Sequence, residues 1–134
     1  MRNDCIFCAI ADGEIPSFKV YEDELVVAYL DINPFSKGHT LVIPKAHFTG
    51  IADTPDEILA AVIARVKKVA VQLKSALKCD GFNILQNNGA AAGQTVMHVH
   101  FHIVPRYGAE PVAFENHPGD KNELQALAER IRLK

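Results

Sequence analysis

The sequence predicts an α+β fold: a five-stranded, mainly antiparallel sheet, one long helix and short peripheral helices. Two observations lead to this prediction. Residues 54–81 carry helix boundary signals and apolar residues at steps of three and four. Five other stretches, separated by turns or loops, are rich in β-branched and apolar residues. The chain has 134 residues, 49% of them hydrophobic, so we expect a single domain over 1–134 with its own core.

Charge and hydropathy restrict the partners of such a domain. The net charge is −2, and lysine and arginine are scattered along the chain, which argues against duplex nucleic acid or an anionic membrane as partner. No stretch approaches the roughly 18 apolar residues of a membrane span, and the N-terminal residues lack a signal-peptide core. We therefore expect a cytoplasmic protein. A phosphorylated small molecule remains compatible, because backbone N–H groups can hold a phosphate.

The first third of the chain is expected to form a short helix and three strands. Residues 5–11 are an apolar patch of one or two helical turns. Strands over 19–21 and 25–31 form a hairpin around the turn Glu22-Asp23-Glu24. Asn-Pro and Gly mark 31–38 as a loop, and the third strand covers 39–44, stopped by Pro44.

The long helix has the clearest boundaries. Thr54 is expected as N-cap and Pro55 as the first helical residue, with Glu57 completing a capping box. Asp80-Gly81 supplies the stop. An apolar stripe faces a core or a partner. Its members are Ile58, Val62, Val66, Val69, Leu73 and Leu77.

The last third holds two strands and a short helix. The fourth strand is expected over 82–86, followed by a loop of small residues over 87–95. The fifth covers 97–104 and is closed by Pro105. Residues 107–118 are expected to be irregular. Asp120 then caps a short amphipathic helix. Its apolar residues are Leu124, Leu127, Ala128 and Ile131.

Three histidines alternate with apolar residues in the fifth strand. Residues two apart on a strand share a face and lie about 6.7 Å apart. The imidazoles of His98, His100 and His102 therefore line one face, while Val99, Phe101 and Ile103 pack into a core. Histidine is poor core filler but a good nucleophile, proton carrier or metal ligand. The row predicts a functional site.

The cysteines suggest a metal rather than a disulfide framework. Cys5 and Cys8 have the spacing of half a zinc site, and three cysteines are an odd number for disulfide bonds. A redox pair and two idle thiols remain alternatives. Cys79 has no visible partner and is expected to be structural.

Together these motifs resemble the histidine triad (HIT) superfamily of nucleotide hydrolases and transferases, in its histidine triad nucleotide-binding (HINT-like) branch of bacterial type. The resemblance runs from Cys5 to Arg106 and leaves 107–134 as a C-terminal extension. It implies a HIT-like fold and a homodimer whose two sheets join, with the long helix at the interface. The matching stretches are His98-Val99-His100-Phe101-His102-Ile103-Val104, Phe7 with Ile10 and Ile15-Pro16, Asp31-Ile32-Asn33-Pro34, Gly38-His39-Thr40-Leu41-Val42-Ile43-Pro44-Lys45, and Gln94-Thr95.

The resemblance also implies residue roles. His100 is the nucleophile that forms a covalent nucleotidyl-histidine intermediate, His102 contacts the phosphate, and His39 orients the nucleophile. Asp31 accepts hydrogen bonds from the ribose hydroxyls. Apolar side chains sandwich the base, namely Phe7, Ile10, Ile15, Tyr29 and Ile32. The phosphate and leaving group meet Asn87, Gln94 and Thr95. A structural zinc ion, not needed for the chemistry, is held by Cys5, Cys8, His47 and His98.

The expected function is that of a purine nucleoside phosphoramidase or related nucleotidyl hydrolase. Alternatives are a dinucleoside polyphosphate hydrolase, which shares the same residues, and a non-catalytic nucleotide-binding module. Thr95 favours the first, because its hydroxyl can donate a hydrogen bond to a leaving amine. The segment from Tyr107 onward directly follows the histidine strand and is expected to set leaving-group selectivity.

Overall fold

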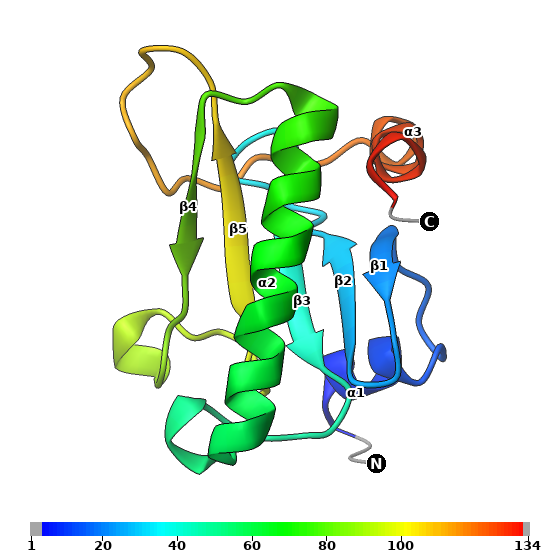
Figure 1. The fold of residues 1–134 in the computed structure, drawn as a ribbon, viewed down its shortest axis with the longest axis vertical. Coiled ribbons are helices and arrows are strands. Elements are labelled where there is room, and N and C mark those ends of the chain that lie inside the picture. Colours follow the sequence, from blue (N-terminus) through cyan, green and yellow to red (C-terminus); the bar gives the residue numbers. More distant parts are fainter. Residues whose placement is uncertain (1–3, 133–134) are drawn as a thin grey trace.

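The computed structural model describes residues 4–132. Five strands form one antiparallel sheet in the order β1-β2-β3-β5-β4 (Figure 1), which confirms the predicted architecture. The elements in chain order are α1 (Ile6–Ala11), β1 (Lys19–Glu22), β2 (Val26–Leu30), β3 (Thr40–Pro44), a 3-10 turn (Ile51–Asp53), α2 (Asp56–Leu77), β4 (Gly81–Leu85), a second 3-10 turn (Ala90–Ala92), β5 (Phe101–Arg106) and α3 (Lys121–Ile131). Among these residues, none of the helices has the length and hydropathy of a membrane span.

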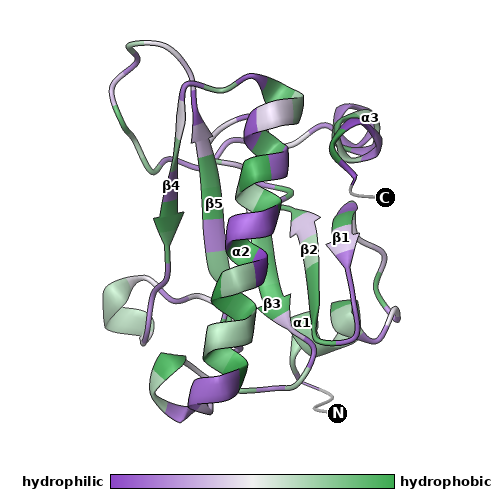
Figure 2. Ribbon diagram, in the orientation of Figure 1, coloured by the Kyte–Doolittle hydropathy of each residue, from purple (hydrophilic) through white to green (hydrophobic). Residues whose placement is uncertain are grey.

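Helix α2 lies across one face of the sheet, with apolar strands behind it (Figures 1 and 2). The predicted stripe faces this sheet: Val62, Val66, Val69, Leu73 and Leu77 are buried in the main core cluster. A single chain therefore uses the stripe as its own core. The stripe thus serves as a core, one of the two roles that the sequence left open, and the homodimer stays a prediction.

The opposite face of the sheet is covered by α1. Phe7 and Ile10 of this helix pack with a second cluster that includes Tyr29 and Leu41. Since β2 and β3 have helices on both sides, every residue of these two strands is buried. This double burial explains why both strands read as continuous apolar runs rather than as alternating patterns.

Both ends of α2 differ from the sequence prediction. The Thr54 hydroxyl donates to the Gly50 carbonyl, so it does not cap the helix, and Pro55 occupies the N-cap position without a side-chain bond. The helix ends at Leu77 because Lys78 adopts a left-handed conformation (φ 56°). Gly81 is instead the first residue of β4. The predicted capping box and Asp80-Gly81 stop were therefore wrong, because the local hydrogen bonds went to other partners.

Strand β5 begins at Phe101, later than predicted, and Pro105 lies inside it. Before Phe101 the backbone bonds outside the ladder: the Val99 amide donates to the Phe48 carbonyl, 2.6 Å away. Pro105 is accommodated because β3 pairs with β5 only up to Ile103, so the later residues pair with β4 alone. The alternation itself holds, since Phe101 and Ile103 lie in the core beneath α2.

The C-terminal extension packs against the rest of the chain. Asp120 caps α3 through the Glu123 amide, as predicted, and α3 buries Leu124, Ala128 and Ile131 in the main core. Residues 107–119 contain no helix or strand. They are tied to the loop before β3 by hydrogen bonds from the Asn116 side chain and from the amides of His117 and Gly119, which reach carbonyls of residues 32–34.

Asp23, in the predicted hairpin turn, links the sheet to α2. Its carboxylate accepts hydrogen bonds from the amides of Leu25 and Val26, the Tyr21 hydroxyl and Arg65 Nε at 2.6–2.9 Å. Burial alone would raise the pKa of Asp23, but these donors outweigh it and hold the pKa well below its usual range. The charged carboxylate is therefore favoured in the folded state.

Replacing Asp23 with alanine is expected to lower the free energy of unfolding by about 1–3 kcal/mol at neutral pH. A group with a depressed folded pKa contributes stability above its unfolded pKa of about 3.9, and loses it as the pH falls toward the folded value. The difference in free energy of unfolding between Asp23→Ala and wild type, measured by urea unfolding, should therefore become smaller below about pH 4. A difference that stays constant down to pH 2 would contradict this account.

Candidate functional site

A pocket of about 270 Å³ opens on the α1 face of the sheet. Nine predicted site residues line it: Phe7, Ile10, Ile15, Tyr29, Asp31, Ile32, Thr95, His100 and His102. Strand register explains how two of them meet, because Tyr29 pairs with Leu41 of β3, which in turn pairs with His102. Side chains opposite one another across a sheet share a face. Leu41 therefore joins the pocket, although sequence reasoning had not placed it there.

His100 lies at the wall of this pocket with only 4% of its surface exposed. Its Nδ1–H donates to the His98 carbonyl at 2.8 Å, so Nε2 carries the free lone pair. Burial lowers the pKa of His100, which keeps the ring neutral. The edge-to-face contact with Phe7, whose ring centroid lies 5.0 Å away, holds the ring in place. A neutral imidazole with a fixed free nitrogen can act as a nucleophile.

His39 contacts His102 directly. His39 Nε2 lies 2.9 Å from His102 Nδ1, and the Phe35 amide donates to His39 Nδ1 at 2.9 Å. Burial, the largest cause in each case, lowers the pKa of His39 to about 3 and that of His102 to about 4. Both rings are therefore neutral near pH 7. The sequence prediction had His39 orient the nucleophile, whereas its hydrogen bond in the structure orients the neighbouring His102.

Asp31 directly follows β2, and one of its carboxylate oxygens accepts a hydrogen bond within the chain. Oδ1 accepts the Asn33 amide at 2.8 Å, in an Asx-type turn, while Oδ2 lies 3.8 Å from His39 Nε2. Burial raises the pKa of Asp31. Nearby, the hydroxyls of Ser17 and Tyr29 are buried without a hydrogen-bond partner among residues 4–132, although both residues line the pocket. The pocket thus combines apolar walls with polar atoms that an occupant could pair.

The loop between β4 and β5 is organised by Gln94. Its side-chain oxygen accepts the Gly89 amide, and its amide group donates to the carbonyls of Thr49 and Val96. The Gln94 side chain is 97% buried, with 3% of its surface exposed. This side chain positions the loop, and its expected contact with a phosphate stays a prediction. Thr95, the next residue, is exposed and lines the pocket. Asn87 lies in the same loop, and its role at the phosphate stays a prediction.

The four predicted zinc ligands come together from distant parts of the chain. Cys5, Cys8, His47 and His98 place their ligand atoms within 4.8 Å of one another. Three of their sulfur–nitrogen distances are 3.3–3.5 Å. Tetrahedral zinc with these donors requires separations of about 3.5 Å. The residues therefore fit a zinc ion, and no disulfide bond joins Cys5 to Cys8.

Phe35 and Phe114 extend the site beyond His102 and were missed in the sequence. The Phe35 ring lies 4.7 Å from that of His39 and contacts Phe114 edge-on at 5.8 Å. The Arg106 guanidinium stacks on Phe114 at 5.1 Å. Phe35 belongs to an irregular loop and Phe114 to the segment after β5. Neither position carries a periodic or motif signal, so only the folded chain brings them to the site.

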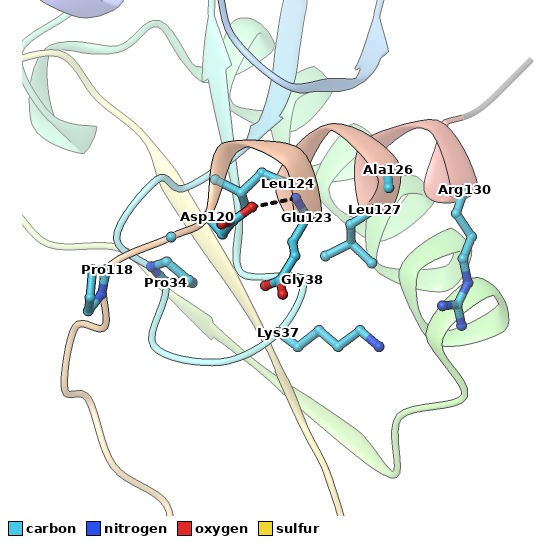
Figure 3. A pocket seen from close by; sticks show the side chains of 11 residues that line it. Pro34, Lys37, Gly38, Pro118, Asp120, Glu123, Leu124, Ala126, Leu127 and Arg130 are labelled. Carbon is cyan, nitrogen blue, oxygen red and sulfur yellow. Dashed lines mark hydrogen bonds between the residues drawn. The ribbon is translucent and has the colours of Figure 1, made fainter.

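A larger pocket, of about 500 Å³, lies elsewhere, between α3 and the loop before β3 (Figure 3). Leu124 and Leu127 of α3 line it together with Lys37, Glu123 and Arg130. None of the predicted site residues lines it. The smaller pocket is the candidate active site, because it, and not the larger one, is lined by His100, His102 and Asp31.

Comparison with known proteins yields consistent matches. The family model described as HIT domain matches residues 12–109. The adenosine 5'-monophosphoramidase hnt1 of Schizosaccharomyces pombe is 44% identical over 133 residues, which cover 97% of each chain. The adenylylsulfatase HINT3 of Arabidopsis thaliana is 46% identical over 106 residues, or 79% of this chain and 54% of that protein. A crystal structure of a zinc-bound histidine triad family protein from Mycobacterium smegmatis has a TM-score of 0.84 and 41% identity, covering 96% of this chain and 93% of that one.

Proposed function

The chain belongs to the HIT domain family, and from this we propose that it is a nucleotide hydrolase that cleaves purine nucleoside 5'-phosphoramidates. One observation carries the proposal: the buried, neutral His100 keeps Nε2 free at the wall of a pocket that also holds Asp31. A binding site for a nucleotide does not require a reactive imidazole there.

The proposed reaction has two steps. His100 Nε2 attacks phosphorus, the bond between phosphorus and the leaving amine breaks, and that amine takes up a proton. Water then cleaves the phosphorus–nitrogen bond of the nucleotidyl-histidine intermediate and releases a nucleoside 5'-monophosphate. His102, the neighbour of His100 on the same face, supplies a hydrogen-bond donor at the phosphate. Thr95 faces the leaving group in this scheme, while Phe35 and Phe114 stand beyond His102.

A substrate panel tests this function. Purified protein with zinc bound is given adenosine 5'-phosphoramidate, diadenosine polyphosphates and adenosine monophosphate. We expect the highest kcat/KM for the phosphoramidate. A preference for the diadenosine polyphosphates would instead support the dinucleoside polyphosphate hydrolase. Nucleotide binding without any turnover would support a non-catalytic module and overturn the proposal.

Asp31 is proposed to bind the ribose hydroxyls through its carboxylate. Replacing it with asparagine is expected to lower kcat/KM for the ribonucleoside substrate about 10–100-fold, since hydrogen bonds to a charged group contribute about 1.5–3 kcal/mol. For the corresponding 2'-deoxyribose substrate, the same replacement should lower kcat/KM much less. Steady-state kinetics with both sugars checks this, and an equal loss for the two would argue that Asp31 acts elsewhere.

We also propose that the cluster of Cys5, Cys8, His47 and His98 binds structural zinc. Two thiols and two imidazoles are a typical donor set for this ion, and the separations fit. The cluster joins the N-terminal segment to the residues just before β5. The three unbridged cysteines support a cytoplasmic location, because thiols persist in reducing compartments.

We propose the homodimer that the resemblance implies, with the two sheets joining at β4 and the outer side of α2 at the interface. Strand β4 is an edge strand of the sheet, and Phe82 and Ile84 on it are 38% and 39% exposed. On the outer side of α2, Ile63 and Val71 are 45% and 59% exposed. An unpaired strand edge beside exposed apolar side chains is a typical site of association.

The double variant Val71→Glu/Ile84→Lys is expected to convert the dimer to a monomer, because it places charges on the proposed interface. Sedimentation velocity of both proteins measures the change. Ile6→Glu, which alters an exposed apolar residue of α1 on the opposite face of the sheet, should remain dimeric. A wild type that is monomeric at high protein concentration would refute the homodimer.

A further inference from the structure

Within residues 4–132, two clusters of side chains bring metal-binding atoms within 4.8 Å of one another. One is the thiol and imidazole cluster described above. The other consists of Asp31, His39 and His102 beside the nucleotide pocket. Two imidazoles and one carboxylate are a common ligand set for divalent transition metals. By residue type and proximity alone, the second cluster could therefore bind a metal ion as the first one could.

Backbone hydrogen bonds distinguish the two clusters. In the first, His98 Nε2 lies 2.8 Å from the Pro44 carbonyl. A carbonyl only accepts, so Nε2 carries the hydrogen and Nδ1 presents its lone pair toward the sulfur atoms of Cys5 and Cys8. A carbonyl behind a histidine fixes the tautomer that binds a metal.

In the second cluster the partner behind the histidine is a donor. The Phe35 amide points at His39 Nδ1 from 2.9 Å, so Nδ1 must accept. Neutral His39 then carries its hydrogen on Nε2. The nearest acceptor is His102 Nδ1 at 2.9 Å, whereas the carboxylate oxygen of Asp31 lies 3.8 Å away. The hydrogen of His102 is consequently on its own Nε2.

We propose that the backbone N–H of Phe35 keeps metal ions out of the Asp31–His39–His102 cluster and fixes a hydrogen on His102 Nε2. A metal at His39 Nε2 would require the ring hydrogen to move to Nδ1, where it would face the Phe35 N–H, donor against donor. The same metal would take the lone pair of His102 Nδ1. The use of the His102 hydrogen by a substrate rests on the proposed function. The exclusion of metal ions does not depend on that function.

A backbone donor suits this role because it neither titrates nor rotates away. The loop that carries it is held from both sides: the His39 amide donates to the Ser36 carbonyl, and the His117 amide donates to the Pro34 carbonyl. The Phe35 ring, 4.7 Å from that of His39, blocks displacement of the imidazole. Phe35 is thus a positioning residue that acts on His102 through His39, and any residue other than proline supplies the amide.

The test replaces the amide and leaves every side chain in place. Phenyllactic acid, incorporated at position 35, converts the N–H of Phe35 into an ester oxygen. Wild type and ester variant, both loaded with zinc, are equilibrated with Co²⁺ and desalted. We expect about one more cobalt ion per chain in the ester variant, with the visible spectrum of nitrogen and oxygen ligation and no sulfur charge-transfer band. Asp31→Asn in the ester background should remove the added cobalt.

Nitrogen-15 NMR of the imidazoles gives a readout that needs no turnover. In the wild type, His39 and His102 should both carry hydrogen on Nε2, and in the ester variant His102 should populate the other tautomer. Phe35→Leu is the matched control, because it removes the ring and retains the N–H, so it should gain no cobalt. Wild-type His102 with hydrogen on Nδ1, cobalt bound to that cluster in the wild type, or an ester variant without added cobalt would each overturn the proposal. A protein that is inactive on every nucleotide would refute the proposed function, but the cobalt and NMR measurements would still test the exclusion of metal and the tautomer of His102.

Discussion

Replacing His100 with asparagine is expected to abolish hydrolysis of adenosine 5'-phosphoramidate while nucleotide binding persists. Asparagine approximates the size of the imidazole and can hydrogen-bond the His98 carbonyl, but it offers no nucleophilic nitrogen. Loss of a nucleophile typically lowers kcat by at least about a thousandfold. The pocket walls and Asp31 are unchanged in this variant. Its dissociation constant for adenosine monophosphate should therefore stay within a few-fold of the wild-type value.

Intact-protein mass spectrometry after a brief exposure to substrate distinguishes covalent catalysis from simple loss of activity. The wild type should show the added mass of one nucleotidyl group, and His100→Asn should not. His117→Asn is a suitable control, since its exposed imidazole lies outside the site and only its backbone bonds the loop. An adduct that persists in His100→Asn, or turnover at the wild-type rate, would show that another group attacks phosphorus.

Removal of Cys8, a proposed zinc ligand, is expected to have the largest effect on stability. Cys8→Ser should abolish binding of about one zinc ion per chain and lower Tm by at least about 10 °C, because binding of a structural zinc ion contributes directly to folding. The cluster joins α1 to the segment that leads into β5, which are more than 80 residues apart in the chain. Metal analysis and calorimetry with and without a chelator measure both effects.

The same substitution should alter substrate binding in a defined way. Phe7 and Ile10 line the pocket and lie on the helix that carries Cys8. Loosening that helix should raise KM more than it lowers kcat. Cys79→Ser is the control, because it also removes a buried thiol but lies outside the cluster. A wild-type protein that carries no zinc and keeps its Tm in chelator would contradict the zinc proposal.

Several features of this protein follow from local sequence alone. Strict alternation around His100 predicted that the histidines share one face opposite Phe101 and Ile103, because the side-chain period of extended backbone is two. The cap at Asp120 and the stripe from Val62 to Leu77 were equally readable. Each of these features depends on residues that are close in the chain, so tertiary packing does not change it. The grouping of Cys5 and Cys8 with His47 and His98, in contrast, was predicted only through the resemblance to a family.

Tertiary structure decided which partner each polar group takes. Thr54 bonds Gly50 instead of the helix, Gln94 holds its loop, and β5 starts only where β3 can pair with it. These outcomes depend on atoms brought close by folding, which no local pattern contains. The same holds for the two sets of histidines: a carbonyl of Pro44 behind one and an amide of Phe35 behind the other determine where each ring carries its hydrogen. Sequence motifs specify imidazoles, and only the fold specifies which nitrogen is free.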